Sequence, residues 1–99
     1  MDIQVEELKD KLDAKDDFIL IDVREDYERA EFHVGGDHIP LGTLPANLED
    51  YEDAKEKEIV VYCRSGNRSG QAKAFMEQMG FKNVRNLVGG MLEWNRKGL

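Results

Sequence analysis

The sequence has very few residues of the kinds that build disulfides or metal sites. It contains one cysteine, Cys63, and two histidines, His33 and His38, among 99 residues. A single cysteine excludes an internal disulfide framework and any zinc site that needs two or more thiolates from this chain. The two histidines lie on either side of Asp37, which is a weak pattern for a metal site. We therefore expect no metal and no other cofactor.

Long apolar runs and an excess of basic residues are also missing. No stretch approaches the roughly 20 apolar residues of a membrane helix. Residues 1–6 show no basic region followed by an apolar one, so a cytoplasmic location is the default expectation. Lys and Arg number 14 against 21 Asp and Glu, which gives a net charge of -7. This charge argues against a general nucleic-acid surface or an anionic membrane surface as the partner.

The sequence instead alternates between strand-like and helix-like segments and contains no internal repeat. Its length suits one domain, residues 1–99. Continuous apolar runs at 18–21 and 59–62 are typical of strands covered on both faces. Residues 84–87 predict a third strand and residues 39–41 an extended segment. Helices are predicted over 4–14, 26–32, 45–55, 67–79 and 91–97, with Phe75, Met76, Met79 and Trp94 facing the core. The alternation predicts an α/β domain with a mostly parallel central sheet and helices on both faces.

Cys63 directly follows the predicted strand 59–62, where ligands bind in sheets of this kind. Gly66 eases a tight turn, and the backbone N–H groups of the turn have no strand partner, so they can converge on an anion. The helix that starts near Asn67 adds the positive end of its dipole. Together with the charges of Arg64 and Arg68, these features favour a thiolate at Cys63.

The alternative is a buried structural cysteine, since free cysteine is often buried as a small apolar residue. The residues that follow Cys63 are two arginines, a glycine and small polar residues, which are poor core material. The sequence around Cys63 therefore favours a reactive thiol.

Residues 63–69, Cys-Arg-Ser-Gly-Asn-Arg-Ser, resemble the active-site loop of the rhodanese family of sulfurtransferases. The resemblance extends to Asp22-Val23-Arg24-Glu25, to 39–41 (Ile-Pro-Leu), and to 86–94 (Asn-Leu-Val-Gly-Gly-Met-Leu-Glu-Trp). It covers essentially the whole chain and implies a single rhodanese-like domain. One departure is the stretch 32–36, Phe-His-Val-Gly-Gly, where many members carry Gly-His-Ile-Pro-Gly-Ala. It affects local packing and leaves the roles of His33 and His38 open.

The resemblance implies that a Cys63 thiolate takes the outer sulfur of a small-molecule donor such as thiosulfate and holds it as a persulfide. An external acceptor, cyanide or a thiol that includes the thiol of a partner protein, then removes the sulfur. The substrate-binding residues would be Arg64, Ser65, Gly66, Asn67 and Arg68, supported by Asp22, Arg24 and Ser69.

Two other functions fit parts of the pattern. The first is a phosphatase or an arsenate reductase. Tyrosine-type and dual-specificity phosphatases also place a cysteine-to-arginine loop before a helix, but with five residues in between, whereas four separate Cys63 from Arg68. A shorter loop makes a smaller cradle, suited to sulfur more than to phosphate. A non-catalytic binding or regulatory module of the same fold is the second alternative. The intact cysteine and both loop arginines favour the enzyme.

Overall fold

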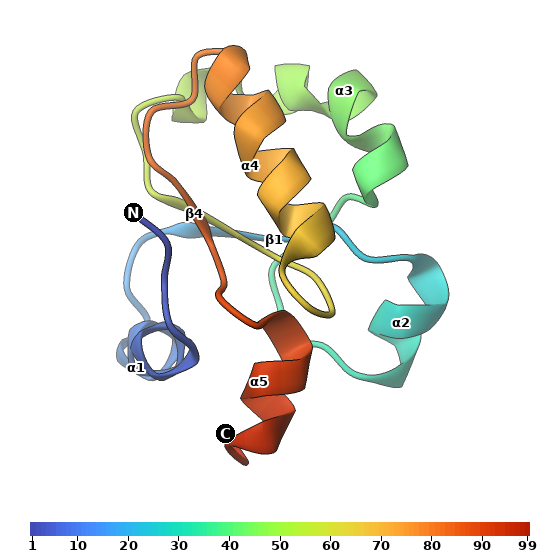
Figure 1. Cartoon of the computed structure of the whole chain (residues 1–99). Coiled ribbons are helices and arrows are strands. Elements are labelled where there is room, and N and C mark those ends of the chain that lie inside the picture. Colours follow the sequence, from blue (N-terminus) through green and yellow to red (C-terminus); the bar gives the residue numbers. More distant parts are fainter.

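The computed structural model describes residues 1–99 and contains a four-stranded sheet in the order β2-β1-β3-β4, with every neighbouring pair parallel (Figure 1). The strands are β1 (Ile19–Asp22), β2 (Asp37–His38), β3 (Ile59–Tyr62) and β4 (Val84–Asn86). The α-helices are α1 (Val5–Ala14), α2 (Asp26–Glu31), α3 (Leu44–Asn47), α4 (Asn67–Gln78) and α5 (Gly90–Arg96). Two 3-10 helices span Leu41–Thr43 and Leu48–Ala54. The predicted α/β class with a parallel sheet is confirmed.

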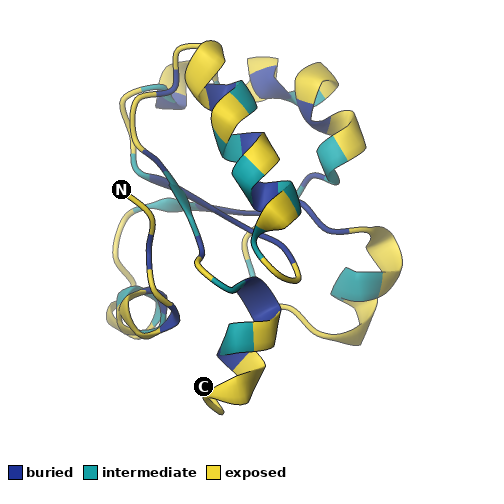
Figure 2. Ribbon diagram, viewed as in Figure 1, coloured by how far each residue is buried: buried dark blue, intermediate teal, exposed yellow.

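The two faces of the sheet bury separate apolar clusters, and β3 contributes to both. Ile59 and Val61 face the side of α3 and α4, whereas Val60 and Tyr62 face the side of α1 and α5. This alternation is the two-residue period of a strand. Because both faces are covered, all four β3 residues are buried, which explains the continuous apolar run at 59–62 (Figure 2).

The carboxyl ends of β1, β3 and β4 lie side by side. Asp22 is paired with Tyr62 in the strand register, and Val61 is paired with Asn86. The residue that follows β3, Cys63, therefore lies between the last residue of β1 and the last residue of β4. This edge of the sheet carries the polar groups described below.

Three predictions need correction. The segment predicted to be extended at 39–41 is extended at Pro40, with a φ of -51° and a ψ of 141°, but its hydrogen-bonded strand lies earlier, at Asp37–His38, and a 3-10 turn begins at Leu41. The helix predicted at 45–55 is α-helical only over Leu44–Asn47. Its second half is a 3-10 helix, which places the inward residues Leu48, Tyr51 and Ala54, three apart, on one face.

The third correction concerns Met79, which was predicted to face the core and is instead 50% exposed. It lies just past the end of α4, and the chain then reverses at Gly80, which has a φ of +97°. Phe81, after this turn, fills the core position instead.

The helices are too short or too polar for any of them to span a lipid bilayer.

Candidate active site

The loop between β3 and α4 is held from outside by the first turn of α5. The N–H of Met91 donates to the Cys63 carbonyl at 3.0 Å, and the N–H of Leu92 donates to the Arg64 carbonyl at 2.9 Å. A side chain at Gly90 would come within 2.4 Å of the Cys63 carbonyl oxygen, so this close approach requires glycine. With these carbonyls turned towards α5, loop N–H groups are free to face the sulfur.

Hydrogen-bond donors converge on the sulfur of Cys63. The N–H of Gly66 lies 3.1 Å from Sγ, the N–H of Ser69 lies 3.4 Å from it, and the Ser69 hydroxyl lies 3.3 Å from it. Gly66 adopts a φ of +103°, which only glycine takes readily, and this conformation turns the loop into α4. The cradle expected from the sequence is therefore formed by the backbone of the loop together with one side chain.

This cradle lowers the pKa of the Cys63 thiol below its ordinary value. Burial is the largest single influence and raises the pKa, since Cys63 is only 1% exposed. Hydrogen bonds from the Ser69 hydroxyl and from the N–H groups of Ser69, Gly66 and Ser65 together outweigh it. Hydrogen bonds, more than the arginine charges expected from the sequence, therefore favour the thiolate.

Asn86, the last residue of β4, joins the loop to Ser69. Its amide nitrogen donates to the Gly66 carbonyl at 3.0 Å. Its amide oxygen lies within hydrogen-bond distance of the Ser69 hydroxyl, whose single proton goes either to this oxygen or to Cys63 Sγ. Both of its partners are themselves donors to Cys63 Sγ. Sequence reasoning missed Asn86, although it lies next to the last residue of the predicted strand 84–87. A polar residue near the carboxyl end of a parallel strand is a usable signal.

The two loop arginines have different surroundings. Arg68 makes a two-point ion pair with Glu28 of α2, with N–O distances of 2.6 and 2.8 Å. The hydrogen bonds from Arg68 are the main reason why the pKa of Glu28 falls to about 2. Arg64 is exposed, and its side chain forms no hydrogen bond or ion pair. Sequence reasoning missed Glu28, because nothing local to α2 shows what it faces.

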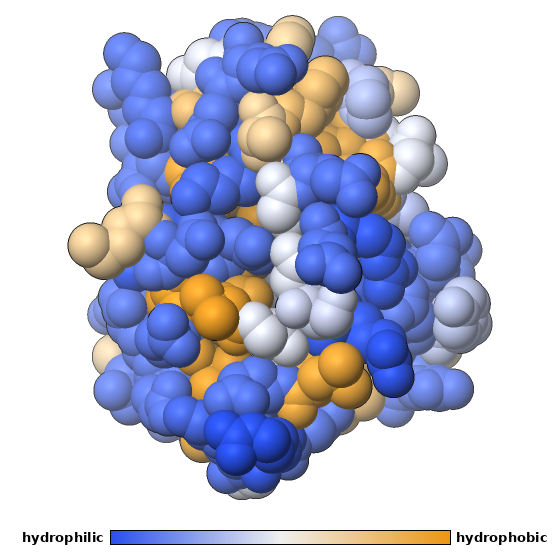
Figure 3. Space-filling model, viewed as in Figure 1, coloured by the Kyte–Doolittle hydropathy of each residue, from blue (hydrophilic) through white to orange (hydrophobic).

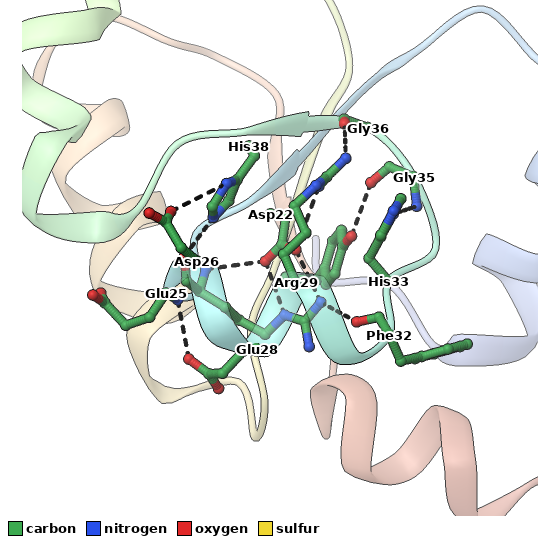
Figure 4. A network of polar contacts seen from close by, with 12 residues as sticks. Asp22, Glu25, Asp26, Glu28, Arg29, Phe32, His33, Gly35, Gly36 and His38 are labelled. Carbon is green, nitrogen blue, oxygen red and sulfur yellow. Dashed lines mark hydrogen bonds and ion pairs between the residues drawn. The ribbon is translucent and has the colours of Figure 1, made fainter.

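Asp22 and Arg24 form a buried ion pair at the neighbouring strand end. The Asp22 carboxylate is fully buried and accepts from Nε and Nη2 of Arg24, both at 2.9 Å, and from Arg29 at 3.4 Å. Figure 4 shows Asp22 at the centre of this cluster with Arg29 reaching in from α2, while Glu28 points out of it. Arg24 also lies over the ring of Tyr62 and donates to the Phe32 carbonyl. The pair makes no hydrogen bond to the loop, so it braces the end of β1 against α2.

The side chains of the remaining predicted residues make no contact with the sulfur. Ser65 and Asn67 are exposed, and their side chains form no hydrogen bond. His33 accepts from the N–H of Gly35, and His38 contacts the Arg24 carbonyl at 2.8 Å, so the two rings serve separate backbone contacts (Figure 4). No group of three His, Cys, Asp or Glu side chains could hold a metal ion.

The structure is therefore an α/β domain with a parallel sheet. A buried cysteine follows one of its two central strands, and the loop after that cysteine can bind an anion. The chain belongs to the family of rhodanese-like domains, whose family model matches residues 4–97. It is 42% identical to the putative sulfurtransferase YtwF of Bacillus subtilis over 94% of this chain and 88% of that protein. It is 36% identical to a sulfurtransferase of Allochromatium vinosum over 99% of this chain and 91% of that one.

The fold is shared with the human single-domain sulfurtransferase TSTD1. The TM-score is 0.80 and the sequence identity 29%, with 99% of this chain and 97% of that chain covered. Family, fold and named relatives thus support a rhodanese-like sulfurtransferase.

Proposed function

We propose that this chain moves sulfane sulfur from a donor such as thiosulfate to an external acceptor through a persulfide on Cys63. The observation that carries the proposal is the convergence of three hydrogen-bond donors on Cys63 Sγ. These donors favour the thiolate that must attack, and they suit the anionic outer sulfur of the persulfide. A reducing compartment such as the cytoplasm fits, because the thiol must be free.

The reaction has two balanced halves. In the first, the Cys63 thiolate attacks the outer sulfur of thiosulfate, the S–S bond of thiosulfate breaks, and sulfite leaves with the electron pair. In the second, cyanide or a thiolate attacks the outer sulfur of the persulfide, and Cys63 leaves as a thiolate. Covalent catalysis of this kind replaces one difficult transfer with two easier ones.

The other loop residues take supporting parts in this scheme. Arg64, the free cation, meets an anionic donor, while Arg68 is held by Glu28 and braces the start of α4. The backbone of Ser65, Gly66 and Asn67 continues the anion cradle. Ser69 donates to the sulfur, and Asp22 with Arg24 steadies the adjacent strand end.

Cys63 is the only thiol, so the chain cannot resolve its own persulfide by forming a disulfide. The acceptor must come from outside, and the donor's product leaves before the acceptor reacts. With thiosulfate and cyanide varied, double-reciprocal plots should give parallel lines. Intersecting lines would indicate direct transfer in a ternary complex.

The direct test is the intact mass after incubation with thiosulfate. We expect one added sulfur on the wild-type chain, removed by dithiothreitol, and none on Cys63→Ala or Cys63→Ser. Both variants should fold and lose transfer of sulfur to cyanide. A Cys63→Ala variant with full transfer activity would overturn the proposal. The phosphatase alternative is tested by offering the protein an aryl phosphate as substrate, and we expect no hydrolysis.

A further inference from the structure

A groove of about 260 Å³ borders the cysteine loop. Its lining includes Arg64, the residue after Cys63, and Glu28, which holds Arg68. The second hollow of the molecule, between α1 and β1 around Phe18, contains no residue of the loop. Only the first groove therefore offers a concave surface to a substrate bound beside Cys63.

The charges that line this groove cancel. Two are positive, Arg24 and Arg64, and two are negative, Glu28 and Glu31. The Arg24 charge is already matched by buried Asp22. Glu31 is exposed and forms no ion pair, so it opposes the one free cation, Arg64. A groove that attracts a dianion needs an excess of positive charge, and this groove has none.

The other lining residues are Asn95 and four apolar or aromatic side chains, and part of the apolar surface is exposed. Tyr27 is 70% exposed, Leu92 47% and Phe32 45%, and Met91 lies beside them. Figure 3 shows apolar surface next to the first turn of α5, surrounded by hydrophilic surface. A hollow of this size, with four apolar side chains beside its polar ones, can hold one small organic group, because apolar contacts bind such a group and polar contacts orient it.

From this charge balance and apolar lining we propose that the preferred sulfur donor is a small organic compound of low charge, with its sulfane sulfur next to an apolar carbon group. Glu31, the unpaired carboxylate, disfavours dianions such as thiosulfate, which serves as a poorer donor than such a compound. The inference rests on the proposed sulfur transfer. For an organic thiosulfonate, the Cys63 thiolate attacks the terminal sulfur, the S–S bond breaks, and a sulfinate leaves with the electron pair. No oxidant, reductant or proton is required.

The test compares kcat/KM for thiosulfate, methanethiosulfonate and benzenethiosulfonate, with cyanide as the acceptor, at one pH and low ionic strength. The first two donors differ by one negative charge, and the last two differ in apolar bulk. The donors also differ in intrinsic reactivity. This difference cancels when the ratio of kcat/KM for the same two donors is compared between a variant and the wild type.

Removing a carboxylate should favour the dianion. We expect Glu31→Gln to raise the ratio of thiosulfate to methanethiosulfonate about three- to fivefold, an effect that shrinks in high salt. Leu92→Ala should lower the ratio of benzenethiosulfonate to methanethiosulfonate about fivefold. Glu77→Gln is the matched control, since Glu77 is exposed near the far end of α4 and makes no ion pair. It removes the same charge and should leave both ratios unchanged.

Unchanged ratios in Glu31→Gln and Leu92→Ala, with sulfur transfer intact, would overturn this inference and leave the proposed function standing. Glu31 and the Leu92 side chain lie on the surface, so neither substitution threatens the fold. Absence of a persulfide and of turnover with every donor would instead overturn the proposed function itself.

Discussion

Two clusters of ion pairs lie at opposite ends of the parallel sheet, and only one of them reaches the cysteine loop. At the amino end of β3, Glu58 contacts Lys11 of α1 at 2.9 Å and Arg85 of β4 at 2.6 Å. At the carboxyl end, Asp22 holds Arg24, and nearby Glu28 holds Arg68 of the loop. We call these the Glu58 cluster and the Asp22–Glu28 cluster.

Because only the Asp22–Glu28 cluster contacts the cysteine loop, a paired charge alone does not identify a functional residue in this fold. Both clusters consist of carboxylates that each hold arginine or lysine at short distance. What separates them is the direction of the strands, since parallel strands all deliver their last residues to one edge. Asp22, Cys63 and Asn86 meet at that edge, whereas Glu58 lies at the other end and ties α1 and β4 to the start of β3.

The largest effect is expected from breaking the buried pair. Asp22→Ala leaves the buried Arg24 guanidinium without its carboxylate, and an unpaired buried charge costs about 3–5 kcal/mol of unfolding free energy. Urea unfolding measures the loss. Asp22→Asn keeps an acceptor oxygen for Arg24 and should lose less. A loss below about 1 kcal/mol in Asp22→Ala would show that Arg24 finds water or another partner.

The free arginine of the loop should matter most for charged donors. Its contact with an anionic donor is worth roughly 1.5–3 kcal/mol, so Arg64→Ala should lower kcat/KM for thiosulfate on the order of ten- to a hundredfold. The loss should fall mainly on KM and be smaller for methanethiosulfonate. Arg64→Lys keeps the charge and is the control. Equal losses for both donors would mean that Arg64 does not sense substrate charge.

The Ser69 hydroxyl should lower the pKa of the Cys63 thiol and play no part in recognising the charge of the donor. Ser69→Ala removes a hydrogen bond to the sulfur, so the pKa of Cys63 should rise. Alkylation by iodoacetamide, followed against pH, reports this shift for the only cysteine in the chain. Ser65→Ala is the matched control, because Ser65 acts through its backbone N–H. A similar shift in both variants would refute a specific role for the hydroxyl.

Sequence reasoning recovered what is local and missed what depends on contacts between distant elements. The strands at 59–62 and 18–21 could be predicted because strands covered on both faces carry unbroken apolar runs. The cysteine loop could be predicted because Cys63, Gly66 and the start of α4 are contiguous. The exposure of Met79 was missed, since helical periodicity alone does not show where the last turn leaves the core.

Asn86 and Glu28 show why part of the site stayed hidden. The contacts of Asn86 with the loop depend on β4 lying next to β3, and strand order is not written in either segment. The pairing of Glu28 with Arg68 joins residues 40 positions apart and depends on which side of α2 turns towards the loop. A charged residue on a short surface helix is ordinarily solvated, so its charge alone gave no signal.

The Glu28–Arg68 pair should make stability depend on pH in an acid range. The folded-state pKa of Glu28 is about 2, below the ordinary 4.5, because the carboxylate accepts hydrogen bonds from Arg68. A lowered pKa stabilises the folded chain above pH 4.5, and this contribution is lost as the pH falls towards 2. Between those limits, the wild-type chain should lose about 1 kcal/mol more unfolding free energy than Glu28→Gln. Identical acid unfolding curves would refute the pairing in solution.

The smallest effect is expected from the Glu58 cluster, and it should be one of stability alone. Glu58 contacts Lys11 and Arg85 in a partly buried position, so Glu58→Gln weakens two ion pairs but leaves no fully buried charge. We expect a loss of about 1 kcal/mol in urea unfolding at pH 7. The kcat/KM values for thiosulfate and methanethiosulfonate should not change, because no contact leads from Glu58 to the loop. A changed ratio of the two donors would mean that charge at the amino end of the sheet reaches the groove, and the contrast between the two ends would fail.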